Sequence, residues 1–409
     1  MAKNIFLLRK DFPDLPYEFV ERKGTGHPDT LADSLAETLS VEYSKYTLNK
    51  FGAVLHHNFD KVGLLGGSSS VAFGKGSLSN PIRVLINGRV STKFGNQIIP
   101  YEKLINKWTK DFFAIKLPLI NVNKDLFFHF NISNQSSPGK TEEDKVDEAS
   151  RKYWFEPRGL FDLQELTRLF SNDTSLGVGY SPSSKLENLI LKIENTLNSA
   201  QYYKKNKWIG SDIKVMGVRI NNNVSITMCI PQISRFVQNI DEYKKNLDNA
   251  RKDILSIARK SGFNDINLNI NTRDNYERCE LYLTAIGSSI ESGDEGLVGR
   301  GNRVGGVIAS QKPYSMEGVC GKNPVYHIGK IYTVAAREIA IKVYKKYNIK
   351  NEVYLVSQSG RDLVDPWYTL VIVPSSFNEL KGLELFIKKE LLKIPALTKG
   401  ILKRKFIIY

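Results

Sequence analysis

Apolar residues recur at helical spacing early in the chain. The row consists of Leu31, Leu35, Leu39 and Tyr43. Residues four apart lie on one face of a helix, so this row predicts a helix. Asp29 precedes the row and can cap the helix, and Gly52 suits its end. We therefore expect a helix over residues 29–50.

Similar patterns predict further helices and several strands. Ser184 and Glu187 have the spacing of a capping box at the start of one helix. The other predicted helices cover residues 240–258, 331–347 and 380–392. The predicted strands cover residues 53–65, 266–270, 281–286, 353–356 and 369–373.

Two segments have the pattern of β-hairpins. Ile82–Thr92 carries the turn dipeptide Asn87-Gly88 between apolar residues, and Lys214–Ile230 surrounds Asn221–Asn223. Hairpins mixed with helices favour layered α+β architecture over a doubly wound parallel sheet. The polar, charged segment Ser133–Ser150 is typical of an exposed loop or insertion.

Length and composition are those of a globular protein of two to four units. The chain has 409 residues, of which 41% are hydrophobic and 25% charged. No run approaches the ~20 apolar residues that a membrane span needs, and the N-terminus lacks the features of a secretory signal. We expect a cytoplasmic protein. The three cysteines have no metal-binding or redox spacing.

The formal net charge of +15 is the unusual feature of the composition. A basic excess attracts nucleic acids, acidic surfaces or phosphorylated substrates. The lysines are spread along the chain without a basic stripe interleaved with aromatic residues. A solvated lysine-rich surface therefore explains the charge as simply, and specific nucleic-acid binding is a minor alternative.

Glycines stand next to charged residues in the segment 23–29, Lys-Gly-Thr-Gly-His-Pro-Asp. His27 can donate a hydrogen bond to a phosphate or ribose oxygen, and Asp29 can bind Mg²⁺ through oxygen. A tight turn into a capped helix explains the same residues. A second segment, 56–61, brings Asp60 beside Lys61, which suits a metal or phosphate site or an ordinary half-buried strand.

Two more segments combine glycine with charge. Asp173 precedes Gly177-Val178-Gly179, a spacing that suits close approach to a small molecule but is weak on its own. The segment 293–330 is the richest. Its basic residues in glycine-rich surroundings are Arg300, Arg303, Lys322 and Lys330, with His327 nearby. Arginine and lysine at this density favour polyphosphate binding over a solvated loop, although neither the P-loop nor the dinucleotide fingerprint is present.

Six stretches in order resemble the archaeal-type S-adenosylmethionine synthetases. They read ERKGTGHPDTLAD, HHNFDK followed by GG, NDTSLGVGYSP, IKVMGVR, SGDEGLVGRGNRVGG and SMEGVCGKNPVYHIGKIY. The resemblance implies three similar α+β units in pseudo-threefold arrangement, with mixed or antiparallel sheets and helices on their outer faces. These units would interleave an N-terminal region (residues 1–130), a central region (residues 151–270) and a C-terminal region (residues 271–409).

The resemblance also implies the chemistry. Methionine sulfur would attack C5′ of ATP and expel tripolyphosphate, which is then cleaved to pyrophosphate and phosphate. It implies Mg²⁺, in many relatives K⁺, and a homodimer with active sites in the subunit interface. A thioether needs no general base, which agrees with the lack of any nucleophile–base pattern.

Carried over by motif, the implied roles fall into three groups. The catalytic residues would be His27, Arg300, Lys322 and Lys330. The residues that bind ATP or methionine would be Lys61, Asp173, Asp294, Arg303 and His327. The metal ligands would be Asp29 and Asp60. The sequence departs from the family pattern at residues 134–139, which lack the expected glycine-rich segment, and at Gly305, where Asn is expected. A catalytically altered homologue, acting on a methionine analogue or as a partner subunit, is the alternative.

Overall fold

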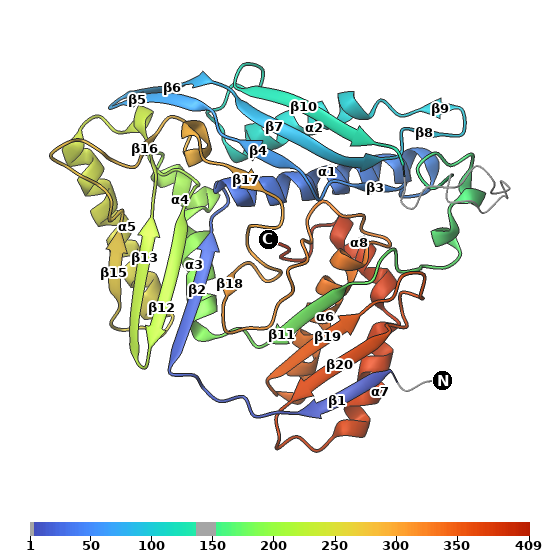
Figure 1. The fold of residues 1–409 in the computed structure, drawn as a ribbon. Helices are drawn as coiled ribbons and strands as arrows, with labels where there is room; N and C mark the ends of the chain where they lie inside the picture. The colour runs from blue at the N-terminus through green and yellow to red at the C-terminus, as the bar shows by residue number, and fades with distance from the viewer. Residues whose placement is uncertain (1–3, 136–152) are drawn as a thin grey trace.

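Three larger β-sheets surround a common centre, each with helices packed against it (Figure 1). This computed structural model describes residues 4–135 and 153–409. Each sheet forms a separate cluster of buried apolar side chains with its helices. Within the described residues, no helix is both long and apolar enough to cross a membrane.

The first sheet has the order β10-β7-β4-β17, with β3 paired to β7. Its strands are β10 (Leu126–Ser133), β7 (Ile82–Val90), β4 (Gly63–Leu65), β17 (Gly296–Leu297) and β3 (His57–Asn58). Helices α1 (Pro28–Phe51) and α2 (Tyr101–Lys116) supply apolar side chains to the same core.

The second sheet has the order β15-β13-β12-β2-β18. Its strands are β15 (Asn267–Ile270), β13 (Asn223–Cys229), β12 (Lys214–Ile220), β2 (Tyr17–Lys23) and β18 (Ile308–Ala309). Helices α3 (Lys185–Leu197) and α5 (Ile240–Lys260) pack on this sheet. The third sheet has the order β1-β20-β19-β11. Its elements are β1 (Ile5–Arg9), β20 (Tyr368–Val373), β19 (Asn351–Val356), β11 (Leu176–Ser181), α6 (Ile328–Tyr347) and α7 (Leu380–Leu391).

Shorter elements connect these layers. They are β5 (Ser68–Ala72), β6 (Lys75–Asn80), β8 (Lys93–Phe94), β9 (Gln97–Ile98), β14 (Gln232–Ile233), β16 (Leu283–Thr284), α4 (Ala200–Lys205) and α8 (Leu397–Leu402). Helices α2, α5 and α7 present a polar face to solvent, whereas α1 and α6 are buried along most of their surface.

Strands far apart in the sequence pair within each sheet. The N-terminal β1 runs parallel to the C-terminal β20, β2 pairs with β12, and β17 pairs with β4. The sheets combine parallel and antiparallel pairs, so the α+β class expected from the sequence is confirmed. The division of the chain into three interleaved units is a proposal that this sharing of strands supports.

The predicted hairpin at Ile82–Thr92 is wrong. β7 runs as one strand through Asn87 and Gly88, between β10 on one side and β3 and β4 on the other. A Cβ on Gly88 would lie 2.3 Å from the backbone oxygen of Asn58. The lack of a side chain at Gly88 therefore lets the backbone of β3 pack closely against β7. Pairing of β7 with strands on both sides overrides the local preference for a turn.

Other expectations hold with changed limits. The hairpin around Asn221–Asn223 forms from β12 and β13, and the capping box at Ser184 is present. His27, rather than Asp29, is the N-cap of α1. Residues 53–65 form two short strands instead of one, and 281–286 contain only the two-residue β16. The predicted Ser133–Ser150 loop lies mostly outside the described residues.

The glycines of β11 accommodate a helix. A Cβ on Gly177 would lie 2.2 Å from the backbone carbon of Tyr332, and one on Gly179 would lie 2.3 Å from that of Ala336. Both contacts are with the backbone of α6, which crosses β11. The prediction that Gly177-Val178-Gly179 lets a small molecule approach is therefore wrong, because the α6 backbone occupies the space beside these glycines.

Gly179→Ala should destabilise the fold, because the backbones of β11 and α6 cannot move apart without repacking the apolar core of the third sheet. We expect a loss of about 1–3 kcal/mol or more, the usual cost of overpacking, measured by urea unfolding. Gly382→Ala in α7 is the matched control, since its Cβ would meet nothing closer than 3.8 Å. That variant should be neutral or gain about 0.5–1 kcal/mol. Equal stability of the two variants would contradict the packing argument.

Candidate active site

Helix α1 carries three buried carboxylates on one face, at Asp29, Asp33 and Glu37. Each accepts a backbone N–H from the segment 297–321. Leu297 N lies 3.1 Å from Asp29 Oδ1, Gly299 N lies 2.8 Å from Asp33 Oδ1, and Gly321 N lies 3.1 Å from Glu37 Oε2. This carboxylate ladder fixes the glycine-rich segment to the helix, since buried carboxylates require such partners.

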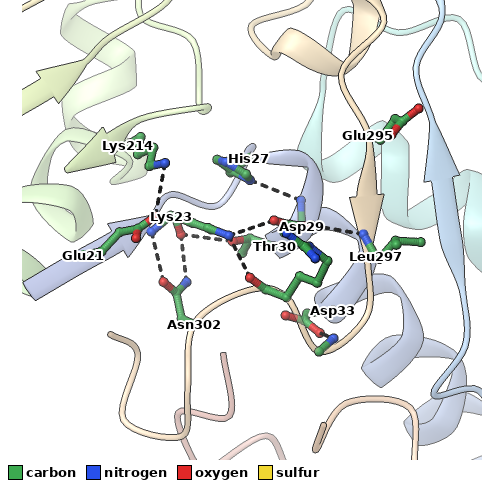
Figure 2. Close-up of polar contacts among 12 residues, drawn as sticks. Glu21, Lys23, His27, Asp29, Thr30, Asp33, Lys214, Glu295, Leu297 and Asn302 are labelled. Carbon is green, nitrogen blue, oxygen red and sulfur yellow. Dashed lines mark hydrogen bonds and ion pairs between the residues drawn. The ribbon is translucent and has the colours of Figure 1, made fainter. Parts of the chain in front are cut away.

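A first group of polar residues, the α1 cluster, surrounds the N-terminus of α1 (Figure 2). Its members are Lys23, His27, Asp29, Arg300 and Asn302. The ammonium of Lys23 lies 2.8 Å from Asp29 Oδ2 and donates to the backbone oxygen of Arg300 at 2.7 Å. Asn302 binds both the N–H and the carbonyl of Lys23. The side chain of Arg300 is exposed.

His27 is held in a defined tautomer. Its Nδ1 accepts the N–H of Asp29 at 3.2 Å. Burial lowers the pKa of His27, although the carboxylates of Asp212 and Asp29 oppose that shift. A neutral ring that accepts at Nδ1 carries its proton on Nε2. His27 can therefore offer one N–H donor to a ligand without a net charge.

Asp212 connects the α1 cluster to Asp294. Ser289 Oγ lies 2.5 Å from Asp212 Oδ2 and 3.0 Å from Asp294 Oδ2, and the hydroxyl of Tyr282 donates to Asp212 at 3.1 Å. Burial raises the pKa of Asp212. Asp294 itself is exposed, so its carboxylate is accessible to a ligand.

A second group is called the α6 cluster. It comprises Glu317 and Lys322 from the segment that precedes α6, and Asp60 and Lys61 from the segment that follows β3. Asp60 Oδ2 lies 2.8 Å from the ammonium of Lys61 and 3.9 Å from that of Lys322. The Glu317 carboxylate also contacts Lys322 and accepts from Ser175 Oγ at 3.0 Å. Burial lowers the pKa of Lys322 to about 8, although Asp60 opposes that shift.

Two further predicted residues lie near this cluster. His327 is the N-cap of α6, and its buried Nδ1 has no hydrogen-bond partner among the described residues. Burial lowers the pKa of His327 well below its usual value, and the charges of Lys322 and Lys330 add to this effect. Asp173 is exposed, accepts the N–H of Thr174, and its charge favours the protonated form of Lys322.

Comparison with known proteins places the chain in a family. The model described as S-adenosylmethionine synthetase (AdoMet synthetase) matches residues 7–405. The chain belongs to this family. It is 39% identical to the probable S-adenosylmethionine synthase of Aquifex aeolicus, with 96% of this chain and 95% of that protein covered. It is 35% identical to the S-adenosylmethionine synthase of Hyperthermus butylicus, with the same coverage of each chain.

A solved structure agrees at the level of the fold. An unusual S-adenosylmethionine synthetase from Campylobacter jejuni matches with a TM-score of 0.58 at 13% identity. The match covers 92% of this chain and 88% of that one. The resemblance carried by the six sequence stretches is thereby confirmed for the family, whereas the roles of individual residues remain predictions.

The structure separates the predicted residues of this family member into two groups. His27, Asp29 and Arg300 meet in the α1 cluster, and Asp60, Lys61 and Lys322 meet in the α6 cluster. Among the described residues, no side-chain hydrogen bond or ion pair joins one cluster to the other. The carboxylate ladder links them through the backbone.

Two predicted phosphate ligands differ from the others in their surroundings. Arg303 donates to the backbone oxygen of Gly299 at 3.0 Å and lines a cavity to which Asn302 of the α1 cluster and Glu317 of the α6 cluster also contribute. Lys330 is fully buried, and its ammonium lies 2.9 and 2.7 Å from the two oxygens of Glu37. This geometry leaves no free ammonium at Lys330 for a phosphate.

Sequence reasoning missed the residues that position the others. They are Lys23, Asp33, Glu37, Asp212 and Glu317. One signal was available, because Asp29, Asp33 and Glu37 repeat every four residues on a helix with an apolar row beside them. Carboxylates at that spacing on a helix buried all round indicate internal partners. The others are brought to the site only by the tertiary fold.

Asp33 should make stability depend on pH. Burial raises its pKa to about 7, although hydrogen bonds from the N–H groups of Gly299 and Gly301 act to lower it. Between pH 4 and 7 the folded state therefore binds more protons than the unfolded state, and the stability contributed by Asp33 falls as pH rises. A shift of this size corresponds to a loss of up to roughly 4 kcal/mol.

Asp33→Asn tests this, because an amide imitates the protonated carboxyl. Urea unfolding of both proteins from pH 4.5 to 8 should show the variant gaining stability relative to the wild type as pH rises. A constant difference across this range would show that Asp33 is ionised in the folded protein throughout.

Proposed function

We propose that this chain transfers the adenosyl group of ATP to the sulfur of L-methionine and cleaves the resulting tripolyphosphate to pyrophosphate and phosphate. The observation that carries the proposal is the family match over residues 7–405, with relatives aligned along nearly the whole chain. The two clusters of the site supply charges and donors suited to this chemistry.

The methionine sulfur attacks C5′ as the bond from C5′ to the triphosphate oxygen breaks. The sulfur has no proton to lose, so the reaction needs alignment and stabilisation of the leaving group. His27 Nε2–H would donate to the triphosphate near that bond. Arg300, Arg303, Lys61 and Lys322 would neutralise the charge that develops on its oxygens.

The α6 cluster suits such a leaving group. The Lys322 ammonium rests against Glu317 and near Asp60. A triphosphate could take over these carboxylate contacts, and its charge would favour the protonated form of Lys322. The exposed carboxylates of Asp173 and Asp294 are the candidates for the methionine amine or the adenosine.

We propose that the reaction uses Mg²⁺ and, as the family resemblance implies for many relatives, K⁺. Within residues 4–135 and 153–409, no three His, Cys, Asp or Glu side chains form a ready-made metal site. Mg²⁺ bound to phosphates often takes only one or two protein carboxylates and completes its coordination with phosphate and water oxygens. Asp29 and Asp60 fit that pattern, and the ion would neutralise triphosphate charge.

A homodimer with active sites between subunits is the proposed assembly. It is the assembly that the family resemblance implies. Apolar side chains are also exposed on the sheets, including Phe6 on β1, Phe19 on β2 and Phe127 on β10. Phe6 contacts the exposed ring of Tyr368, and Phe19 contacts that of Tyr17, so exposed apolar side chains gather on two of the sheets. Contiguous patches of this kind occur where another chain binds. The cytoplasmic location stays a prediction.

Incubation with ATP, L-methionine, Mg²⁺ and K⁺ tests the activity. Mass spectrometry should detect S-adenosylmethionine, and pyrophosphate and phosphate should form only with methionine present. If folded protein gave no product, the altered-homologue alternative would be favoured, and a panel of thioethers would follow.

Lys322→Ala should lower kcat about 10²–10³-fold, the usual effect of removing one donor that stabilises a transition state. Lys381→Ala, at an exposed position of α7, is the control and should retain wild-type turnover. Unfolding curves would verify that both variants fold. Near-normal turnover by folded Lys322→Ala would remove this lysine from the active site.

A further inference from the structure

The backbone around Lys322 is held from two sides. Helix α1 provides two side chains: Glu37 accepts the N–H of Gly321 at 3.1 Å, and Ser40 Oγ donates to the carbonyl of Lys322 at 2.9 Å. From the other side, Phe59 N donates to the carbonyl of Gly321 at 2.8 Å. Lys322 itself is 3% exposed.

This support matters because the residue before Lys322 is a glycine in the left-handed region. Gly321 has a φ of 80°, and a Cβ there would lie 2.6 Å from the backbone of Phe59. Glycine permits this close approach but supplies no side chain to fix the conformation. The contacts from Glu37 and Ser40 therefore define where the Lys322 side chain begins.

Lys330 completes the arrangement from α6. Its ammonium is fully buried and contacts both oxygens of Glu37. Glu37 thus binds the N–H of Gly321 and the first turn of α6 at once. A buried carboxylate with only neutral donors would be costly, and a buried ammonium without a partner more so. Each charge keeps the other in place beside the loop.

We propose that Glu37, Ser40 and Lys330 are positioning residues, which hold the Lys322 ammonium where the triphosphate leaves. This inference rests on the proposed function. The sequence predicted that Lys330 binds phosphate. In this proposal Lys330 instead holds Glu37, which in turn holds the backbone of residues 321–322. Stabilisation of a leaving group depends on charges held in place beforehand, so a loosened Lys322 should slow the chemical step more than it weakens binding.

The first test compares two serines one turn apart on α1. Ser40→Ala removes the hydroxyl that donates to Lys322 O and also lies 2.8 Å from buried His57 Nε2. Ser44→Ala removes a buried hydroxyl that donates to Ser40 O within the helix at 2.7 Å. In the full-length protein, Ser40→Ala should lower kcat about 10-fold or more, because small misplacements can cost up to about 10²-fold. The KM values for ATP and methionine should change little, and Ser44→Ala should match the wild type in both parameters.

The second test removes the buried ion pair without leaving one charge alone. Glu37→Gln combined with Lys330→Met keeps the shape and an acceptor for Gly321 N, and thermal unfolding would verify its fold. It should lower kcat with little change in the KM for ATP. A raised KM with unchanged kcat would overturn the inference and return Lys330 to substrate binding.

Two other outcomes would also overturn the inference. One is wild-type kcat in folded Ser40→Ala and in the double variant. The other is an equal loss of kcat in Ser40→Ala and Ser44→Ala, which would indicate a general effect on α1. A wild-type protein without methionine-dependent product would instead overturn the proposed function itself, and with it this inference.

Discussion

The carboxylate ladder on α1 is the constraint on which the rest of the site depends. Asp29, Asp33 and Glu37 are buried, and a buried carboxylate is tolerated only when donors satisfy it. The donors are backbone N–H groups of residues 297, 299 and 321. The need to satisfy three buried groups therefore brings an N-terminal helix and a distant glycine-rich segment together.

The two ends of the ladder lead to the two clusters of the site. At each, a cation is paired with a carboxylate of the chain itself, as Lys23 is with Asp29 and Lys322 with Glu317. The large positive charge of the protein is thus locally balanced where chemistry is proposed. A triphosphate entering such a site could exchange carboxylate partners for phosphate oxygens without creating an unpaired buried ammonium.

Much of the fold is predictable where the local pattern agrees with the final environment. Periodicity and capping residues give helices α1, α3, α5, α6 and α7 to within a few residues, although they do not predict α2, and the 214–230 hairpin forms as expected. Predictions fail where partners from elsewhere decide the conformation. Asn87-Gly88 lies within a central strand because strands on both sides pair with it. Gly177 and Gly179 admit the backbone of α6, although their spacing resembles a ligand loop.

Motifs and periodicity within short stretches are enough to define the family, the α+β class and the set of charged residues. Which of these charges are available to a ligand depends on the tertiary structure. Both lysines are buried, but Lys322 belongs to the α6 cluster, whereas Lys330, eight residues later, contacts both oxygens of Glu37. That difference depends on a partner from α1 nearly 300 positions away. No local pattern contains such information.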